Sequence, residues 1–194
     1  PGERVLVLGA ASLQVLHGRQ AAPPGDRALR ASLKNPELKP GEEHVCPCRK
    51  GTPQSALAGQ WPSLRGPTQS GRASVDKAPV AWSGESGQGI KWKVPLTRTG
   101  SSTPVVWGNR LFLTAGDAAA RTVMAHDAET GALLWSTEVP DGAKGGEALP
   151  EVGEETGLAA SSPACDEARV YAVFATGDVV ALDHAGKIVW QVFL

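Results

Sequence analysis

The chain has 194 residues, a hydrophobic share of 41% and a formal net charge of −1, so it is long enough to bury the core of an ordinary domain. Gly (23) and Pro (15) are frequent, and Trp supplies 6 of the aromatic residues against 3 Phe and 1 Tyr; this composition favours many short strands and turns over long helices. The sequence contains no run of the ~20 apolar residues that span a bilayer, so no transmembrane segment is expected.

The charges are distributed unevenly along the chain. Residues 1–110 carry 15 Lys+Arg against 7 Asp+Glu (net +8), whereas residues 111–194 carry 4 against 13 (net −9). The basic residues occur singly and are not interleaved with aromatic residues, which is typical of a solvated surface and not of a nucleic-acid site. We therefore expect no nucleic-acid partner.

The first 60 residues lack the regular pattern of a folded domain. Segment 4–22 contains the apolar run Val5–Leu16 and ends in small residues, which resembles a secretory signal; an ordinary strand or helix is the alternative. A Pro-rich linker follows up to residue 60. Because the chain opens on Pro1 without an initiator Met, we expect the true start to be missing.

Two of the three cysteines lie in this linker, as Cys46-Pro47-Cys48. Zinc sites usually present C-x₂-C and a second ligand pair, and neither feature is found here. A disulfide across one residue would close a strained ring. We expect ordinary thiols in a flexible segment, and the role of Cys46 and Cys48 stays open.

A more definite pattern begins at Trp61-Pro62-Ser63-Leu64-Arg65-Gly66-Pro67, which we call the opener. Its prolines and glycine predict an extended, turning path, and Arg65 is suited to bonding carbonyls or a carboxylate. A short strand around Trp92 follows, over Ile90–Val94.

From Ser101 the sequence predicts two four-stranded antiparallel meanders, over about 101–139 and 159–194. The third and fourth strands of each are joined by a similar turn that ends in tryptophan. Asp can bond the turn backbone and Gly can adopt a positive φ. The repeated residues are Ala125, Asp127, Thr130, Gly131 and Trp135 in the first unit, and Ala181, Asp183, Gly186 and Trp190 in the second.

A four-stranded meander that repeats at this interval predicts an all-β fold, a partial β-propeller whose blades cover one another. Propellers have about 4–8 blades, whereas this chain offers two full blades and a partial one near Trp92. Because two blades leave faces uncovered, we expect the chain to be a fragment of a larger protein.

The A-x-D-x-x-T-G-x-x-x-W pattern of Ala125–Trp135 resembles the PQQ-like (quinoprotein-type) β-propeller repeat. The opener, with Trp61, Pro62, Arg65, Gly66 and Pro67, resembles the entry of bacterial PQQ-binding-like, BamB-like propeller proteins. The resemblance covers about residues 61–194. It implies that Trp135, Trp190 and Trp92 dock against neighbouring blades.

The same resemblance bears on cofactors. Quinoprotein dehydrogenases hold pyrroloquinoline quinone with a vicinal Cys-Cys pair, a catalytic Asp and calcium ligands; Cys46-Pro47-Cys48 is not equivalent, and Asp127 and Asp183 are turn residues. The acidic loop 139–157 lacks the spacing of a calcium loop. We expect no catalytic, cofactor-binding or metal-binding residue in this segment, and we expect His126 and His184 at the surface or at strand edges.

Three functions remain open. The first is a non-enzymatic, extracytoplasmic scaffold, periplasmic in a bacterium, whose blade loops bind other proteins. The second is a PQQ-dependent oxidoreductase for alcohols or sugars, with calcium and with its site in blades absent from this sequence. The third is a propeller that binds carbohydrate or another ligand. The choice of the first rests on the fold family.

Overall fold

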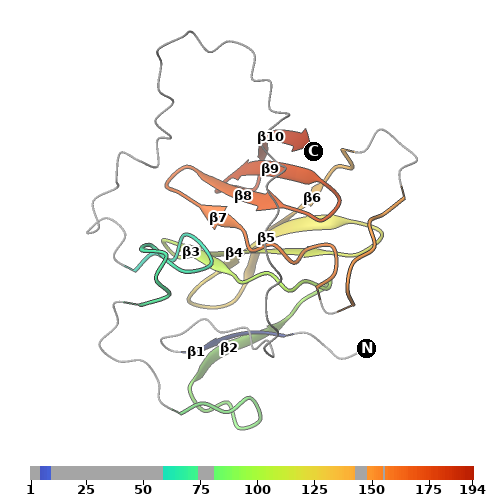
Figure 1. The fold of residues 1–194 in the computed structure, drawn as a ribbon. Helices are drawn as coiled ribbons and strands as arrows, with labels where there is room; N and C mark the ends of the chain where they lie inside the picture. Colours follow the sequence, from blue (N-terminus) through green and yellow to red (C-terminus); the bar gives the residue numbers. More distant parts are fainter. Residues whose placement is uncertain (1–4, 10–58, 74–80, 143–147, 155) are drawn as a thin grey trace.

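The computed structural model describes residues 5–9, 59–73, 81–142, 148–154 and 156–194. These residues form ten strands and no helix (Figure 1). None of them therefore belongs to a helix that could cross a membrane. The strands are β1 (Val5–Gly9), β2 (Ile90–Pro95), β3 (Val105–Trp107), β4 (Arg110–Gly116), β5 (Arg121–Asp127), β6 (Leu133–Val139), β7 (Ala164–Cys165), β8 (Arg169–Val173), β9 (Asp178–Asp183) and β10 (Ile188–Phe193).

Strands β3–β6 and β7–β10 form two antiparallel four-stranded meanders, and β1 pairs with β2. In Figure 1 the three sheets lie one above another, with β1–β2 below and β7–β10 at the top. The registers of the meanders correspond: Val105, Phe112, Ala125 and Trp135 lie side by side in the first, as do Ala164, Tyr171, Ala181 and Trp190 in the second. The predicted all-β fold of propeller blades is confirmed.

The sheet β3–β6 is covered on both faces. One face shares a core with β7–β10, which includes Phe112, Val123, Val170 and Leu182. The opposite face, with Leu111, Leu113, Ala115 and Met124, packs against Trp92, Val94 and Leu96 from the segment of β2. Because both faces are covered, β4 and β5 are buried almost throughout, and each has a short continuous apolar run, Leu111–Leu113 and Val123–Ala125. The outer strands β2, β6 and β10 alternate between covered and exposed residues.

The opener connects β3 and β7, the first strands of the two blades. Trp61 and Val106 of β3 exchange backbone hydrogen bonds of 2.9 and 2.8 Å, and the Cys165 N–H of β7 donates to the Pro62 carbonyl at 2.8 Å. Gly66 allows the chain to fold back over Trp61, since a Cβ there would lie 2.8 Å from the indole. Arg65 is exposed, so its part in the opener is through its carbonyl, which accepts from the Gly71 N–H at 3.0 Å.

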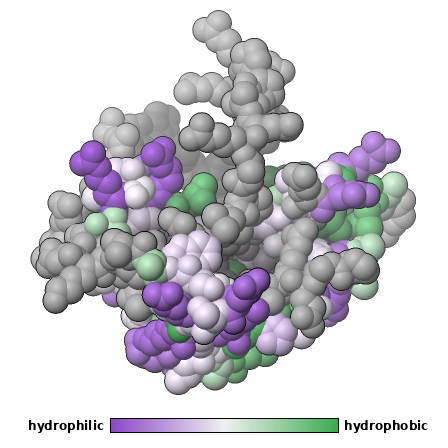
Figure 2. Space-filling model, turned by 90° about the horizontal axis from the view of Figure 1, so that it is seen from below, coloured by the Kyte–Doolittle hydropathy of each residue, from purple (hydrophilic) through white to green (hydrophobic). Residues whose placement is uncertain are grey.

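The apolar segment that resembles a secretory signal is described only at Val5–Gly9, which forms β1. The remainder of segment 4–22, the linker and Cys46 and Cys48 lie outside the described residues. Seen from below, the described surface intersperses hydrophilic and apolar residues (Figure 2).

Candidate functional site

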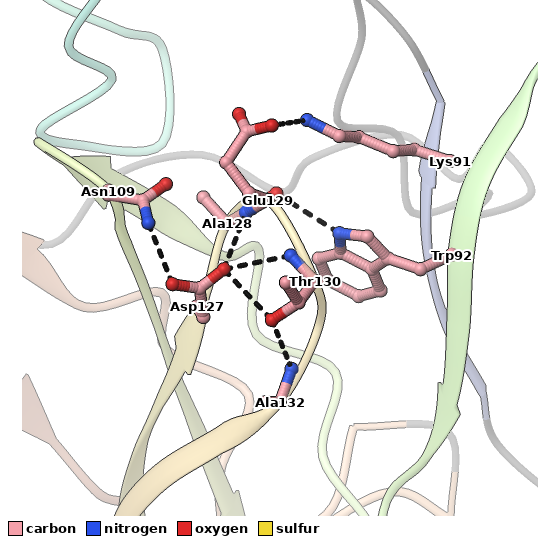
Figure 3. Close-up of polar contacts among 8 residues, drawn as sticks. All are labelled: Lys91, Trp92, Asn109, Asp127, Ala128, Glu129, Thr130 and Ala132. Carbon is pink, nitrogen blue, oxygen red and sulfur yellow. Dashed lines mark hydrogen bonds and ion pairs between the residues drawn. The ribbon is translucent and has the colours of Figure 1, made fainter.

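The turn between β5 and β6 is built around the carboxylate of Asp127 (Figure 3). Its Oδ1 accepts hydrogen bonds from the Glu129 N–H at 2.9 Å and from the N–H and hydroxyl of Thr130 at 2.8 and 2.9 Å. Its Oδ2 accepts from Asn109 Nδ2 at 2.7 Å. The bonds from Thr130 favour the ionised carboxylate, so the pKa of Asp127 lies below its usual range. This carboxylate is fully committed to shaping the turn.

Trp92 of β2 docks on that turn. Its Nε1–H donates to the Ala128 carbonyl at 3.0 Å, and Lys91 forms an ion pair with Glu129. Gly131 has a φ of +76°, and a Cβ there would lie only 2.7 Å from the Trp92 indole. A glycine is therefore required both by the backbone conformation and by the contact.

The turn between β9 and β10 repeats this arrangement one blade further on. Trp135 of β6 donates from Nε1 to the His184 carbonyl at 3.0 Å, and a Cβ at Gly186 would lie 2.6 Å from its ring. Asp183 accepts from the N–H groups of Ala185 and Lys187. The second turn therefore accepts its tryptophan in the same way without the Thr and with one residue fewer.

Trp92, Trp135 and Trp190 each directly follow a bulge residue. The residue before each, Lys91, Leu134 or Val189, has no cross-strand partner in the register of its strand. A bulge twists a strand and redirects the next side chain. Trp190 does not contact a further blade among the described residues: its ring lies 6.2 Å from that of Tyr171 in its own sheet and is 37% exposed.

A second contact joins the segments that lead into β3 and β7, the first strands of the two blades. The Thr103 N–H donates to Ser162 Oγ at 2.8 Å, and Thr114 Oγ1 donates to the Ser161 carbonyl at 3.1 Å. Ser102 Oγ bonds both backbone groups of Thr114. Ser102-Thr103-Pro104 recurs in the second unit as Ser161-Ser162-Pro163, and this repetition is the signal in the sequence for the contact.

A third contact is a buried ion pair. Arg121 lies 3.6 Å from Asp178 and 3.4 Å from Asp141, and both Arg121 and Asp178 are buried. Asp178 also accepts hydrogen bonds from the Gly142 N–H, Gln191 and Thr176. Sequence reasoning missed this pair, because nothing in the spacing shows that residues 121 and 178 meet.

A family model described as "Outer membrane protein assembly factor BamB" matches residues 57–194. The chain belongs to the BamB family. No curated protein matches the chain.

Two solved structures resemble part of this BamB-family chain. BamB from Moraxella catarrhalis is 20% identical, with a TM-score of 0.39, over 53% of this chain and 27% of that one. A europium-containing methanol dehydrogenase is 17% identical, with a TM-score of 0.39, over 54% of this chain and 19% of that one. The chain thus spans well under half the length of either protein.

The BamB-family chain was expected to carry both motif histidines at the surface or at strand edges, and for His126 this is wrong. Its side chain is 4% exposed, and its Nδ1 lies 2.9 Å from the Gly131 carbonyl, to which it can only donate. Its Nε2 is buried without a hydrogen-bond partner in the described structure. His184 is partly buried against Phe112 of the preceding blade, with ring centroids 5.3 Å apart. Both histidines support turns.

The described residues do not match the donor set of a quinone site. Cys165 is the one cysteine among them; it is buried, and burial raises its pKa to about 12, so it remains a thiol. The carboxylates of Asp127, Asp178 and Asp183 are engaged as described above. The residues that the structure describes contain no group of three or more His, Cys, Asp or Glu side chains arranged to hold a metal ion.

Proposed function

We propose that the chain is part of a non-enzymatic propeller scaffold that binds other proteins through its blade loops. The observation that carries this proposal is that the polar groups of the repeated motif are already hydrogen-bonded within the fold. Its carboxylates bond turn amides, and two of its indoles bond carbonyls of the next turn. These groups form a rigid frame, so binding has to rely on the surface that the frame presents.

The loop between the blades offers such a surface. Leu149 and Val152 are 44% and 39% exposed although both are apolar, and the acidic Glu151 and Glu154 beside them are exposed as well. Exposed apolar side chains with charged neighbours are typical of protein-binding surfaces. This combination favours a protein partner with an apolar contact and basic residues at its rim.

The description of the matched family, an outer membrane protein assembly factor, supports an extracytoplasmic location. A fusion of the full-length protein to a reporter that is active only outside the cytoplasm tests this part. Reporter activity outside the cytoplasm is expected, and activity confined to the cytoplasm contradicts the proposed compartment.

The protein-binding function is tested with a photo-crosslinking residue in the full-length protein, in its own cell. We expect a discrete crosslinked protein from positions Leu149 and Val152 and none from Thr68, an exposed control position just after the opener. Leu149→Ser with Val152→Ser should abolish binding of that purified partner. Binding that persists would mean that the loop is not the surface.

Binding of pyrroloquinoline quinone is tested in a separate assay. Pyrroloquinoline quinone and calcium are added to the full-length protein, which is then gel-filtered and assayed with alcohols or sugars and an artificial electron acceptor. We expect no retained chromophore and no dye reduction. A stoichiometric chromophore with substrate-dependent dye reduction would overturn the scaffold proposal in favour of a dehydrogenase.

A further inference from the structure

The pairing of β1 with β2 reproduces the pairing of third and fourth strands inside a blade. In β3–β6, Trp135 lies opposite Ala125, Leu134 is bulged, and Leu133 lies opposite His126. In β7–β10, Trp190 lies opposite Ala181, Val189 is bulged, and Ile188 lies opposite Leu182. The fourth strand therefore pairs with the third strand in the same register in both blades.

Strand β2 keeps this register with a partner from another part of the chain. Trp92 lies opposite Leu8, Lys91 is bulged, and Ile90 lies opposite Gly9. Strands β5 and β9 each lead through one short turn into the strand that they pair with, whereas β1 precedes β2 by some 80 residues. Val5–Gly9 therefore occupies the place of a third blade strand without being joined to β2 by a hairpin.

The position of β2 does not depend on β1 alone. Trp92 donates to Ala128, and Lys91 pairs with Glu129. Arg98, just beyond β2, forms an ion pair in which its Nη1 lies 2.7 Å from both carboxylate oxygens of Asp117. Val94 and Leu96 pack on the core of β3–β6. These contacts fix β2 from the side of the neighbouring blade. The edge of β2 that pairs with β1, which we call its inner edge, is therefore a preorganised row of backbone donors and acceptors.

We propose that the inner edge of β2 is a strand-accepting site, and that its occupant is the chain's own apolar segment Val5–Gly9. The ligand class is an antiparallel apolar strand with the register of a third blade strand, set by the bulge at Lys91. Backbone pairing supplies the affinity, as in other cases where a strand adds to a sheet edge. The site is independent of the loop surface proposed above.

The register is tested by disulfide formation in the full chain with Cys46→Ser and Cys48→Ser. Val7 lies opposite Lys93, whose side chain is exposed, so Val7→Cys with Lys93→Cys should close under mild oxidation. Leu6→Cys with Lys93→Cys is the matched control, because a shift of one residue points the side chain to the other face. We expect at least tenfold more closure for the first pair; equal closure, or more for the control, overturns the proposed register.

The accepting edge is tested by deleting residues 1–9 and following amide hydrogen exchange. Exchange over 90–95 should become at least tenfold faster, while β6 and β10 keep their protection. A synthetic peptide of residues 3–11 should restore the protection of 90–95, and a scrambled peptide should not. If β6 also loses protection, or if the native peptide restores nothing, the edge is not preorganised or Val5–Gly9 is not its ligand. Dimerisation of the deleted chain that the peptide cannot reverse would assign the edge to a second copy.

Discussion

The indole of Trp135 lies directly against the α-carbon of Gly186, a residue of the neighbouring blade, and leaves no room for a side chain there. The same contact joins Trp92 to Gly131. In both cases the indole N–H also donates to a carbonyl in the accepting turn. The distance between blades is therefore set by an aromatic ring packed on bare backbone.

Gly186→Ala should destabilise the chain by about 2–5 kcal/mol. A Cβ would lie 2.6 Å from the Trp135 ring, and overpacking costs about 1–3 kcal/mol. The residue also has a φ of +88°, where an L-residue costs about 1–2 kcal/mol more than glycine. Urea unfolding followed by tryptophan fluorescence measures the sum.

Gly108→Ala is the control for the backbone part of that cost. Gly108 has a φ of +59°, but nothing lies within 4 Å of a Cβ built there. This variant should lose only about 1–2 kcal/mol. Equal losses for both variants would show that the contact between Trp135 and Gly186 contributes little.

Trp135→Ala should cost about 3–5 kcal/mol, as for other large-to-small core changes. The matched variant is Trp190→Ala, at the equivalent position but with an exposed ring. In the described chain it should cost less than half as much, because no accepting turn covers the ring. A loss below about 1 kcal/mol for Trp135→Ala would mean that this ring does not hold two blades together.

Much of the fold could be predicted from local pattern. Short apolar runs separated by turn residues placed the strands from 101 onward, because such runs bounded by turns are typical of strands in a meander. The Asp-x-x-Thr-Gly turn placed the hairpin at 127–131, because an Asp bonds turn amides and a Gly accepts a positive φ. These features depend on neighbours in sequence, and the structure confirms them.

The contacts between blades could not be predicted in the same way. Whether Arg121 meets Asp178 depends on how two sheets pack, and spacing along the chain does not determine this. His126 was misplaced for a related reason: a polar residue beside a turn is usually solvated, but His126 is buried and lies opposite Leu111, on the face of the sheet that packs against Trp92. The strand at Val5–Gly9 was left open between a signal and a strand because its partner lies some 80 residues away.

The Arg121–Asp178 pair gives a prediction about coupling. Asp178→Asn should cost about 3–5 kcal/mol, because the buried guanidinium of Arg121 then keeps only the exposed Asp141 as a charge partner. Arg121→Met should cost a similar amount, and the double variant should lose clearly less than the two single losses combined. A double-mutant cycle by chemical denaturation measures the coupling; additive losses would mean that solvent already screens the pair.

Cys165 should resist alkylation in the folded chain. Its thiol is buried and its pKa is raised to about 12, so almost no thiolate exists at pH 8. With Cys46→Ser and Cys48→Ser, iodoacetamide should label the chain only after denaturation, as measured by intact mass. Labelling of the native chain at the rate of a free thiol would place Cys165 outside the core.

Asp127 should make the stability of the chain depend on pH in a definite direction. The hydrogen bonds from Thr130 lower its pKa in the folded state, whereas an unfolded Asp titrates near 4. The folded state therefore favours the carboxylate. Its contribution is complete above about pH 4–5 and is lost as pH falls through the folded pKa.

The measurement compares the melting temperature of the native chain with that of Asp127→Asn, from pH 7 down to about pH 2.5. Asp127→Asn should melt lower at pH 7, and the difference should shrink as pH falls below about 4, because the native carboxyl is then protonated. Thr130→Ala removes a bonded hydroxyl, so it should raise the pKa of Asp127 toward its usual range and move the decline to higher pH. An NMR titration of the Asp127 carboxyl reads this shift directly. A difference that stays constant across the whole range would show that the turn depends on the shape of the side chain and not on its charge.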